Sequence, residues 1–142
     1  MGLKSGQESV NTRRDKKPVV LFGGNMGSKD VSAEIRKSLK SLDFAFKEVD
    51  GVYKGDKENT FVIPYLTTNE LLSLIALGKH FSQESLLLLD KDRNASLLFM
   101  DRPRKAIELG KFRSFTEKQF DNLNDRLKEN YTFDGDYYYV TY

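Results

Sequence analysis

The stretch Pro18-Val-Val-Leu-Phe-Gly-Gly24 sets the framework of the fold, because an uninterrupted apolar run ends there at two glycines. This pattern is typical of a buried strand that enters a tight loop. Over residues 31–42 the apolar side chains recur every three to four positions, which predicts an amphipathic helix with Asp30 as its N-cap. A strand followed closely by a helix favours a crossover to a second, parallel strand.

The remaining residues alternate between strand and helix patterns. Capping-box spacing and leucine-rich or apolar periodicity predict two further helices, one over 67–78 that ends at Gly78 and one over about 116–129. Short apolar or alternating runs predict strands over 44–49, 60–63, 86–89, 95–100 and 105–109, and a final hairpin over 131–142. The last hairpin contains Asp134-Gly135, which suits a type I′ turn.

These elements predict a single α/β or α+β domain over residues 18–142, a mixed β-sheet packed by about three helices. The chain has 142 residues, 39% hydrophobic and 31% charged, which is enough for one core. It has no cysteine and one histidine, His80, which excludes disulfides, thiolate zinc sites and cysteine nucleophiles. We therefore expect no metal site and no cofactor. No apolar run approaches the ~20 residues of a membrane span, so no membrane partner is expected.

Residues 1–17 differ from the rest of the chain in their amino-acid composition. They carry a net charge of +3 against −1 for the rest of the chain, and they show no apolar periodicity. We interpret them as a flexible basic arm, either a solvated tail or a segment that orders on an acidic partner. Nucleic acid is expected only through this arm, whose proposed contact residues are Arg13, Arg14, Lys16 and Lys17.

The loop Gly23-Gly-Asn-Met-Gly-Ser-Lys29 lies between a strand and a helix, a place where backbone amides can hold an anion. Its spacing does not match a P-loop or a dinucleotide-binding motif, and Asp30 adds negative charge where phosphates would lie. A simple turn is therefore favoured over a weak phosphate or ribose contact, and a nucleoside triphosphate site is disfavoured.

Polar side chains converge on one edge of the predicted sheet. If the first strand runs upward and the helix crosses to a parallel strand, the loops that follow and precede the later strands meet at the same edge. The residues expected there, as a candidate ligand site, are Asn25, Lys29, Glu58, Gln83, Glu84, Ser85, Arg102 and Arg104. The structural alternative is an exposed ion pair of Glu58 with Arg102 or Arg104, with Gln83 and Ser85 capping loop backbones.

The tyrosine-rich C-terminal strand is a second candidate contact surface. Tyr137 and Tyr139 are proposed to contact a partner, although aromatic residues in a strand are more often divided between core and rim. His80, at the end of a predicted helix, is interpreted as a capping residue rather than a general base.

Two segments carry a family resemblance. Glu58-Asn-Thr-Phe-Val-Ile63 and, after the leucine-rich helix, His80-Phe-Ser-Gln-Glu-Ser-Leu86 resemble a loose group of small uncharacterised bacteriophage and bacterial proteins. The group shares a Glu-x-x-Phe-x-Val strand and a Gly-Gln-Glu-Ser segment, and the resemblance spans about residues 20–100. It implies a phage or mobile-element origin, and it makes Glu58, Gln83, Glu84 and Ser85 the recurring polar positions. Ser82 departs from the group, which tends to have glycine there.

Two functions follow as expectations. The first is a small, soluble, phage-type binding protein, a virion-associated or host-interaction component that acts through a protein partner or an oligomer. The alternative is a protein that binds or hydrolyses a nucleotide-like ligand at the shared strand edge. Whether the chain is an enzyme is left open, and its expected location is the host cytoplasm or the virion.

Overall fold

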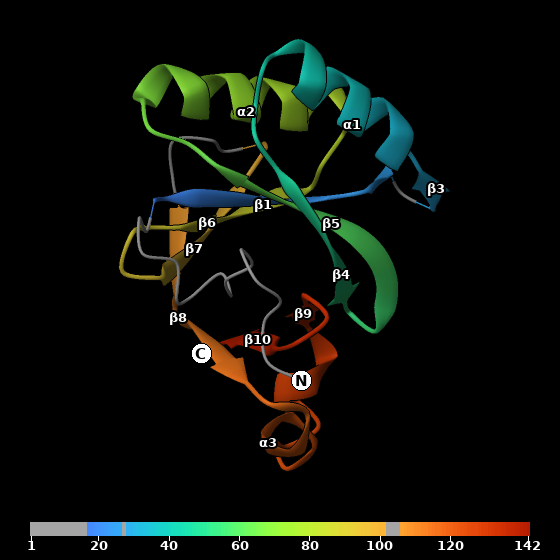
Figure 1. Cartoon of the computed structure of the whole chain (residues 1–142), viewed down its shortest axis with the longest axis vertical. Coiled ribbons are helices and arrows are strands. Elements are labelled where there is room, and N and C mark those ends of the chain that lie inside the picture. The colour runs from blue at the N-terminus through green and yellow to red at the C-terminus, as the bar shows by residue number, and fades with distance from the viewer. Residues whose placement is uncertain (1–16, 27, 102–105) are drawn as a thin grey trace.

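The computed structural model describes residues 17–26, 28–101 and 106–142, and is shown in Figure 1. The strands are β1 (Val19–Gly23), β2 (Asn25–Met26), β3 (Lys29–Asp30), β4 (Lys47–Tyr53), β5 (Asp56–Pro64), β6 (Ser85–Leu89), β7 (Asn94–Phe99), β8 (Ala106–Phe115), β9 (Tyr131–Phe133) and β10 (Tyr138–Thr141). The helices are α1 (Ser32–Ser41), α2 (Thr68–His80), α3 (Glu117–Asp121) and the short 3-10 helix η1 (Leu127–Glu129).

Eight of the strands form a closed barrel. Their order around it is β1-β5-β4-β9-β10-β8-β7-β6, with β6 pairing back to β1, and the small β2-β3 ribbon stands apart. Every pairing among the described strands is antiparallel. The predicted mixed sheet is therefore wrong, and the architecture is an antiparallel barrel with helices on the outside.

The strand directions agree with the prediction, but the predicted order of neighbouring strands does not. Helix α1 does connect β1 to a strand that runs the same way, β4. The tight turn at Lys54-Gly55, where both residues have positive φ, sends β5 back, and β5 then occupies the place beside β1. The crossover rule describes strands of one parallel sheet, and a hairpin partner can insert between them without violating it.

Successive side chains of a strand point to opposite faces, so the barrel strands contribute to two hydrophobic cores, one beneath the helices and one inside the barrel. Outward residues of β1 and β5, such as Phe22 and Phe61, pack with Ile35 of α1 and Leu74 of α2. Figure 1 shows α1 and α2 lying together across this side of the barrel. The inward residues of the same strands form a second cluster inside the barrel, with Leu21 and Val62 among them.

The ends of the first two helices follow from local chemistry. Helix α1 begins one residue later than predicted, with Val31 at the N-cap, but the Asp30 carboxylate still accepts the N–H of Ser32 at 2.9 Å. The capping box at the start of α2 is present as predicted. Helix α2 does not end at Gly78 but continues to His80. Gly78 lies where the helix passes Met100, and a Cβ atom there would be 3.0 Å from the Met100 sulfur.

The C-terminal region differs most from the prediction. The helix expected over about 116–129 is divided into α3 and η1, although its predicted capping box at Thr116 is present. In the last hairpin, Asp134 pairs with Tyr137, so the turn is centred on Gly135-Asp136 and only Gly135 has a positive φ. The predicted Asp-Gly turn is thus shifted by one residue.

Of the predicted basic arm, only Lys17 falls within the described residues. Its carbonyl oxygen accepts a hydrogen bond of 2.7 Å from Arg93, a side chain that is only 4% exposed. No helix in the described part of the chain is long and apolar enough to cross a membrane.

Candidate functional site

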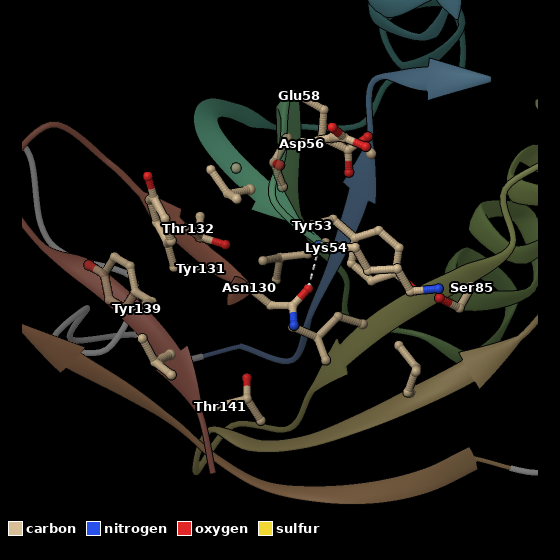
Figure 2. A pocket seen from close by; sticks show the side chains of 18 of the residues that line it. Tyr53, Lys54, Asp56, Glu58, Ser85, Asn130, Tyr131, Thr132, Tyr139 and Thr141 are labelled. Carbon is tan, nitrogen blue, oxygen red and sulfur yellow. Dashed lines mark hydrogen bonds between the residues drawn. The ribbon is translucent and has the colours of Figure 1, made fainter. Parts of the chain in front are cut away.

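A pocket of about 1290 Å³ opens at one end of the barrel. Because all neighbours are antiparallel, the C-terminal ends of β1 and β4 lie at the same end as the N-terminal ends of β5, β6 and β9. Figure 2 shows the side chains of Glu58, Ser85 and Thr132 around this hollow, each from a different strand. The pocket is therefore built from segments that are far apart in the sequence.

Two glycines make room for the polar side chains inside this end of the barrel. Gly51 lies directly opposite Glu58 in the β4-β5 register, and Gly23 lies opposite Thr60 in the β1-β5 register. A Cβ atom at Gly23 would lie 2.7 and 2.9 Å from the two carboxylate oxygens of Glu58. A Cβ atom at Gly51 would collide with the Thr60 hydroxyl. Glycine at these strand positions thus allows the carboxylate to fold against bare backbone.

Glu58 is the central acidic group of the pocket. It is half-buried, and it forms no ion pair with any residue that the structure describes. Burial raises the pKa of its carboxyl group, and the backbone N–H of Asn25, which donates a hydrogen bond to it, acts in the opposite direction. The carboxylate of Glu58 therefore lies at the barrel mouth without an ion-pair partner among the described residues, although Lys54 and Arg126 also line the pocket.

Gln83 supports the loop beside Glu58. Its side-chain oxygen accepts the N–H of Gly23 at 3.2 Å, and its side-chain NH₂ donates to the carbonyl of Asn25 at 3.1 Å. The residue is only 8% exposed. Gln83 therefore caps loop backbone, which is the structural alternative raised from the sequence.

Backbone N–H groups at the start of the 23–29 loop, which the sequence suggests as an anion contact, already have acceptors within the protein. The N–H of Asn25 is directed to the Glu58 carboxylate, and the Gly24 N–H donates to the carbonyl of Asn59 at 2.7 Å. The protein's own Glu58 carboxylate thus occupies part of the predicted anion site.

The outer rim joins the β4-β5 turn to the segment before β9. The N–H of Lys54 donates to the side-chain oxygen of Asn130 at 2.8 Å, the dashed contact in Figure 2, and the N–H of Gly55 donates to the carbonyl of Glu129 at 3.2 Å. Tyr53 lies inward on β4 beyond Gly51 and lines the pocket while 39% exposed. No local motif in the sequence indicates these contacts, because they join segments about 76 residues apart.

The inner end of the pocket is aromatic and apolar. The rings of Phe112 and Tyr139 stack with centroids 4.9 Å apart, and the Tyr139 hydroxyl donates to the Asp134 carboxylate at 2.6 Å. Leu21 and Leu87 also line the pocket. A ligand in the pocket therefore meets polar groups at the mouth and apolar side chains further in.

Most of the predicted site residues come together. Asn25, Glu58, Gln83, Glu84 and Ser85 all line this pocket. Lys29 is exposed on β3 and is not part of the lining. Arg102 and Arg104 lie outside the described residues, as do Arg13, Arg14 and Lys16 of the arm.

The two tyrosines predicted as partner contacts are not on an open surface. Tyr139 is 1% exposed and belongs to the inner core, and Tyr137 is half-buried and packs against that core. His80 is exposed at the last position of α2, edge-on to Phe81 with ring centroids 4.9 Å apart. Among the described residues, no three acidic or histidine side chains gather where a metal ion could be held.

Comparison with known proteins identifies the class. Residues 25–141, from β2 to the last residue of β10, match the S-adenosylmethionine lyase family, whereas no curated protein sequence matches the chain. A lyase family consists of enzymes, so the expected phage-type binding protein, with its virion-associated or host-interaction role, is wrong. The keywords attached to that expectation, bacteriophage and virion component, gain no support from the match. The match covers most of the sequence and nearly the whole barrel, and the chain belongs to the S-adenosylmethionine lyase family.

Proposed function

We propose that this protein is a lyase that cleaves a carbon–sulfur bond of S-adenosylmethionine in the barrel-mouth pocket. Membership of the family supports the reaction class. The pocket supports the location, because it joins a polar mouth, where the Glu58 carboxylate has no ion-pair partner among the described residues, to an apolar interior of a size suited to a nucleoside.

The observation that carries this proposal is the burial of the Glu58 carboxylate without an ion-pair partner among the described residues. The residue is half-buried, and it faces a cavity large enough for a ligand. S-adenosylmethionine carries positive charge on its sulfonium sulfur and on its α-ammonium group. A cationic ligand compensates a partly buried carboxylate, whereas an anionic nucleotide would be repelled by it.

The chemistry of the sulfonium sets what the protein must supply. When the carbon–sulfur bond breaks, its electron pair stays on sulfur and a neutral thioether leaves. In a lyase reaction no water is added, so the carbon either loses a neighbouring proton or forms a bond to another atom of the same substrate. The protein must therefore hold one substrate conformation and keep water from the reacting carbon.

The pocket residues divide these tasks. Positive charge on sulfur falls as the bond breaks, so attraction to Glu58 by itself stabilises the bound substrate more than the transition state. Glu58 therefore contributes to the rate by orienting the cation, and it can accept a proton where the reaction releases one. Leu21 and Leu87 form the apolar wall that keeps water from the substrate.

The test is to incubate the purified protein with S-adenosylmethionine in H₂¹⁸O and to identify the products by mass spectrometry, with a protein-free sample to correct for spontaneous decay. The proposal expects protein-dependent loss of the sulfonium and no ¹⁸O on the carbon that left sulfur. Incorporation of ¹⁸O at that carbon would identify a hydrolase, and absence of turnover by the folded protein would overturn the proposal.

Variants of Glu58 test the site. Loss of a charged hydrogen-bonding partner is typically worth ~1.5–3 kcal/mol, so we expect Glu58→Gln to weaken S-adenosylmethionine binding by about 10- to 100-fold. S-adenosylhomocysteine has a neutral sulfur, and its binding should change less if Glu58 faces the sulfonium. Glu34→Gln, an exposed carboxylate on α1, is the matched control and should change neither.

A further inference from the structure

Both hydrogen-bonding groups of the Gln83 side chain are bonded to the backbone of another segment. The residue is only 8% exposed, and the two backbone groups lie 58 and 60 residues earlier in the chain. A buried glutamine that spends both its donor and its acceptor on another segment fixes that segment more strictly than an apolar side chain of the same size would.

The turn after α2 aims this side chain at the barrel. The N–H of Gln83 donates to the carbonyl of Gly78 at 2.9 Å, and the preceding Ser82 adopts a positive φ of 52°. This turn follows the end of α2 at His80, and β6 begins at Ser85, two residues after Gln83. Gln83 is therefore placed by backbone geometry rather than by packing alone.

The segment that Gln83 holds is the one that touches Glu58. Gln83 binds the N–H of Gly23 and the carbonyl of Asn25, on the two sides of Gly24. Gly23 lies under the Glu58 carboxylate, and the N–H of Asn25 donates to it. One side chain thus holds both residues that contact the Glu58 carboxylate, Gly23 and Asn25, through other backbone groups of the same two residues.

We propose that Gln83 is a positioning residue: its carboxamide clamps the backbone of Gly23–Asn25 and so fixes the location and hydrogen bonding of the Glu58 carboxylate. Its effect on catalysis rests on the function proposed above. Its effect on Glu58 does not, because the clamp is present in the free protein.

The experiment compares Gln83→Met and Gln83→Glu with the wild type. Methionine keeps the length but removes both hydrogen bonds, and glutamate replaces the NH₂ that faces the Asn25 carbonyl with oxygen. The readout is the titration of the Glu58 carboxyl carbon by NMR, assigned with Glu58→Gln. We expect the Glu58 pKa to rise in Gln83→Met, because the Asn25 N–H is no longer held against the charge.

Thr67→Ala is the control for stability alone, since it removes the N-cap of α2 and leaves the pocket lining unchanged. It should lower stability without moving the Glu58 titration. An unchanged titration in Gln83→Met, or an equal shift in Thr67→Ala, would show that Gln83 is only a structural residue.

A further measurement needs no variant. In the wild type, the N–H of Gly23 should show a scalar coupling to the side-chain carbonyl of Gln83 across their hydrogen bond, and absence of this coupling would also overturn the clamp. With S-adenosylmethionine, Gln83→Met should lower kcat by roughly 10- to 100-fold, the size of a misplacement effect, and change KM less. If the wild type is inactive but the titration and coupling behave as described, the proposed function fails and the positioning role stands.

Discussion

The carboxylate of Glu58 occupies the space that a side chain at Gly23 would fill. The two residues lie on neighbouring strands, and the Glu58 oxygens are 2.7 and 2.9 Å from the position of the missing Cβ atom. Real Cβ atoms do not approach oxygen so closely, so glycine at this position is a condition for the present orientation of the acid. The relationship makes a backbone position on β1 part of the site.

Gly23→Ala should therefore displace the carboxylate. The added methyl group is small, so the strand can form, but the Glu58 side chain must rotate away from the Asn25 N–H. Overpacking of this kind costs about 1–3 kcal/mol of stability, and we expect loss of lyase activity of roughly 10- to 100-fold. Steady-state kinetics and urea denaturation measure the two effects.

Gly135→Ala separates these two effects. Gly135 has a φ of +99° and no atoms near its missing side chain, so alanine there is strained but far from the Glu58 carboxylate. It should lose stability and retain activity. If Gly23→Ala is as active as Gly135→Ala, the position of the Glu58 carboxylate does not matter for catalysis.

Glu58→Gln should make the protein more stable at neutral pH. Burial raises the Glu58 pKa in the folded state, so the folded chain holds this proton more tightly than the unfolded chain does. The free energy of unfolding contributed by the group is therefore largest below the unfolded pKa and declines as pH rises through the folded pKa. Glutamine removes this decline, and the gain should be about 0.5–2 kcal/mol, as for other stabilising changes at functional sites.

Urea denaturation of both proteins across the acidic range measures this prediction. The advantage of the variant should shrink as pH falls and the wild-type carboxyl becomes protonated. A variant that is less stable than the wild type at neutral pH would mean that the ionised carboxylate is favourably solvated or paired in solution, contrary to its surroundings here.

Local sequence signals predict most of the elements before residue 100 and their directions. The capping boxes at Thr67 and Thr116 are present, and the strand directions that bring Glu58 and Gln83 to one end are confirmed. Closure of the barrel could not be predicted in the same way. It depends on which strands pair at a distance, such as β4 with β9, and an alternating pattern suits an open sheet or a barrel equally.

Some residues of the site can be predicted from local sequence signals, and others depend on closure of the barrel. Glu58 and Gln83 stand out in the sequence because each follows or precedes a recognisable strand on the predicted edge. The sequence does not place Asn130 and Tyr139 at the ligand site, because β9, β10 and the segment before them reach the pocket only through barrel closure. Tyr53 ends β4 at the predicted edge, but no motif in the sequence marks it. The aromatic pattern that suggested a partner surface for Tyr139 is the pattern of an inward-facing core residue.

Ser82→Gly should stabilise the protein. Ser82 has a φ of 52°, in the left-handed region that costs an ordinary residue ~1–2 kcal/mol and glycine almost nothing. Glycine also loses more chain entropy on folding, so the net gain should be about 0.5–1 kcal/mol. Thermal unfolding measures it, and Ser85→Gly, in a regular strand, is the control that should be destabilising. Destabilisation by Ser82→Gly would mean that the serine hydroxyl stabilises the turn.

Arg36 ties helix α1 to the barrel through Glu48. Its guanidinium donates two hydrogen bonds to the Glu48 carboxylate, at 2.8 and 2.7 Å, and Asn59 of β5 donates a third at 2.7 Å. These contacts, led by the hydrogen bond from Arg36, lower the Glu48 pKa. A lowered pKa contributes stability that is present above the unfolded value and is lost as pH falls through the folded value.

Arg36→Ala should therefore cost stability at neutral pH and little in acid. The pair is partly exposed, so the loss should be small, and smaller at high salt than at low salt. Urea denaturation at several pH and salt values measures the loss, with Lys37→Ala, the exposed neighbour on α1, as the control. If the loss is independent of pH, it arises from the packing of the aliphatic part of Arg36 rather than from its charge, because protonation of Glu48 removes only the electrostatic part.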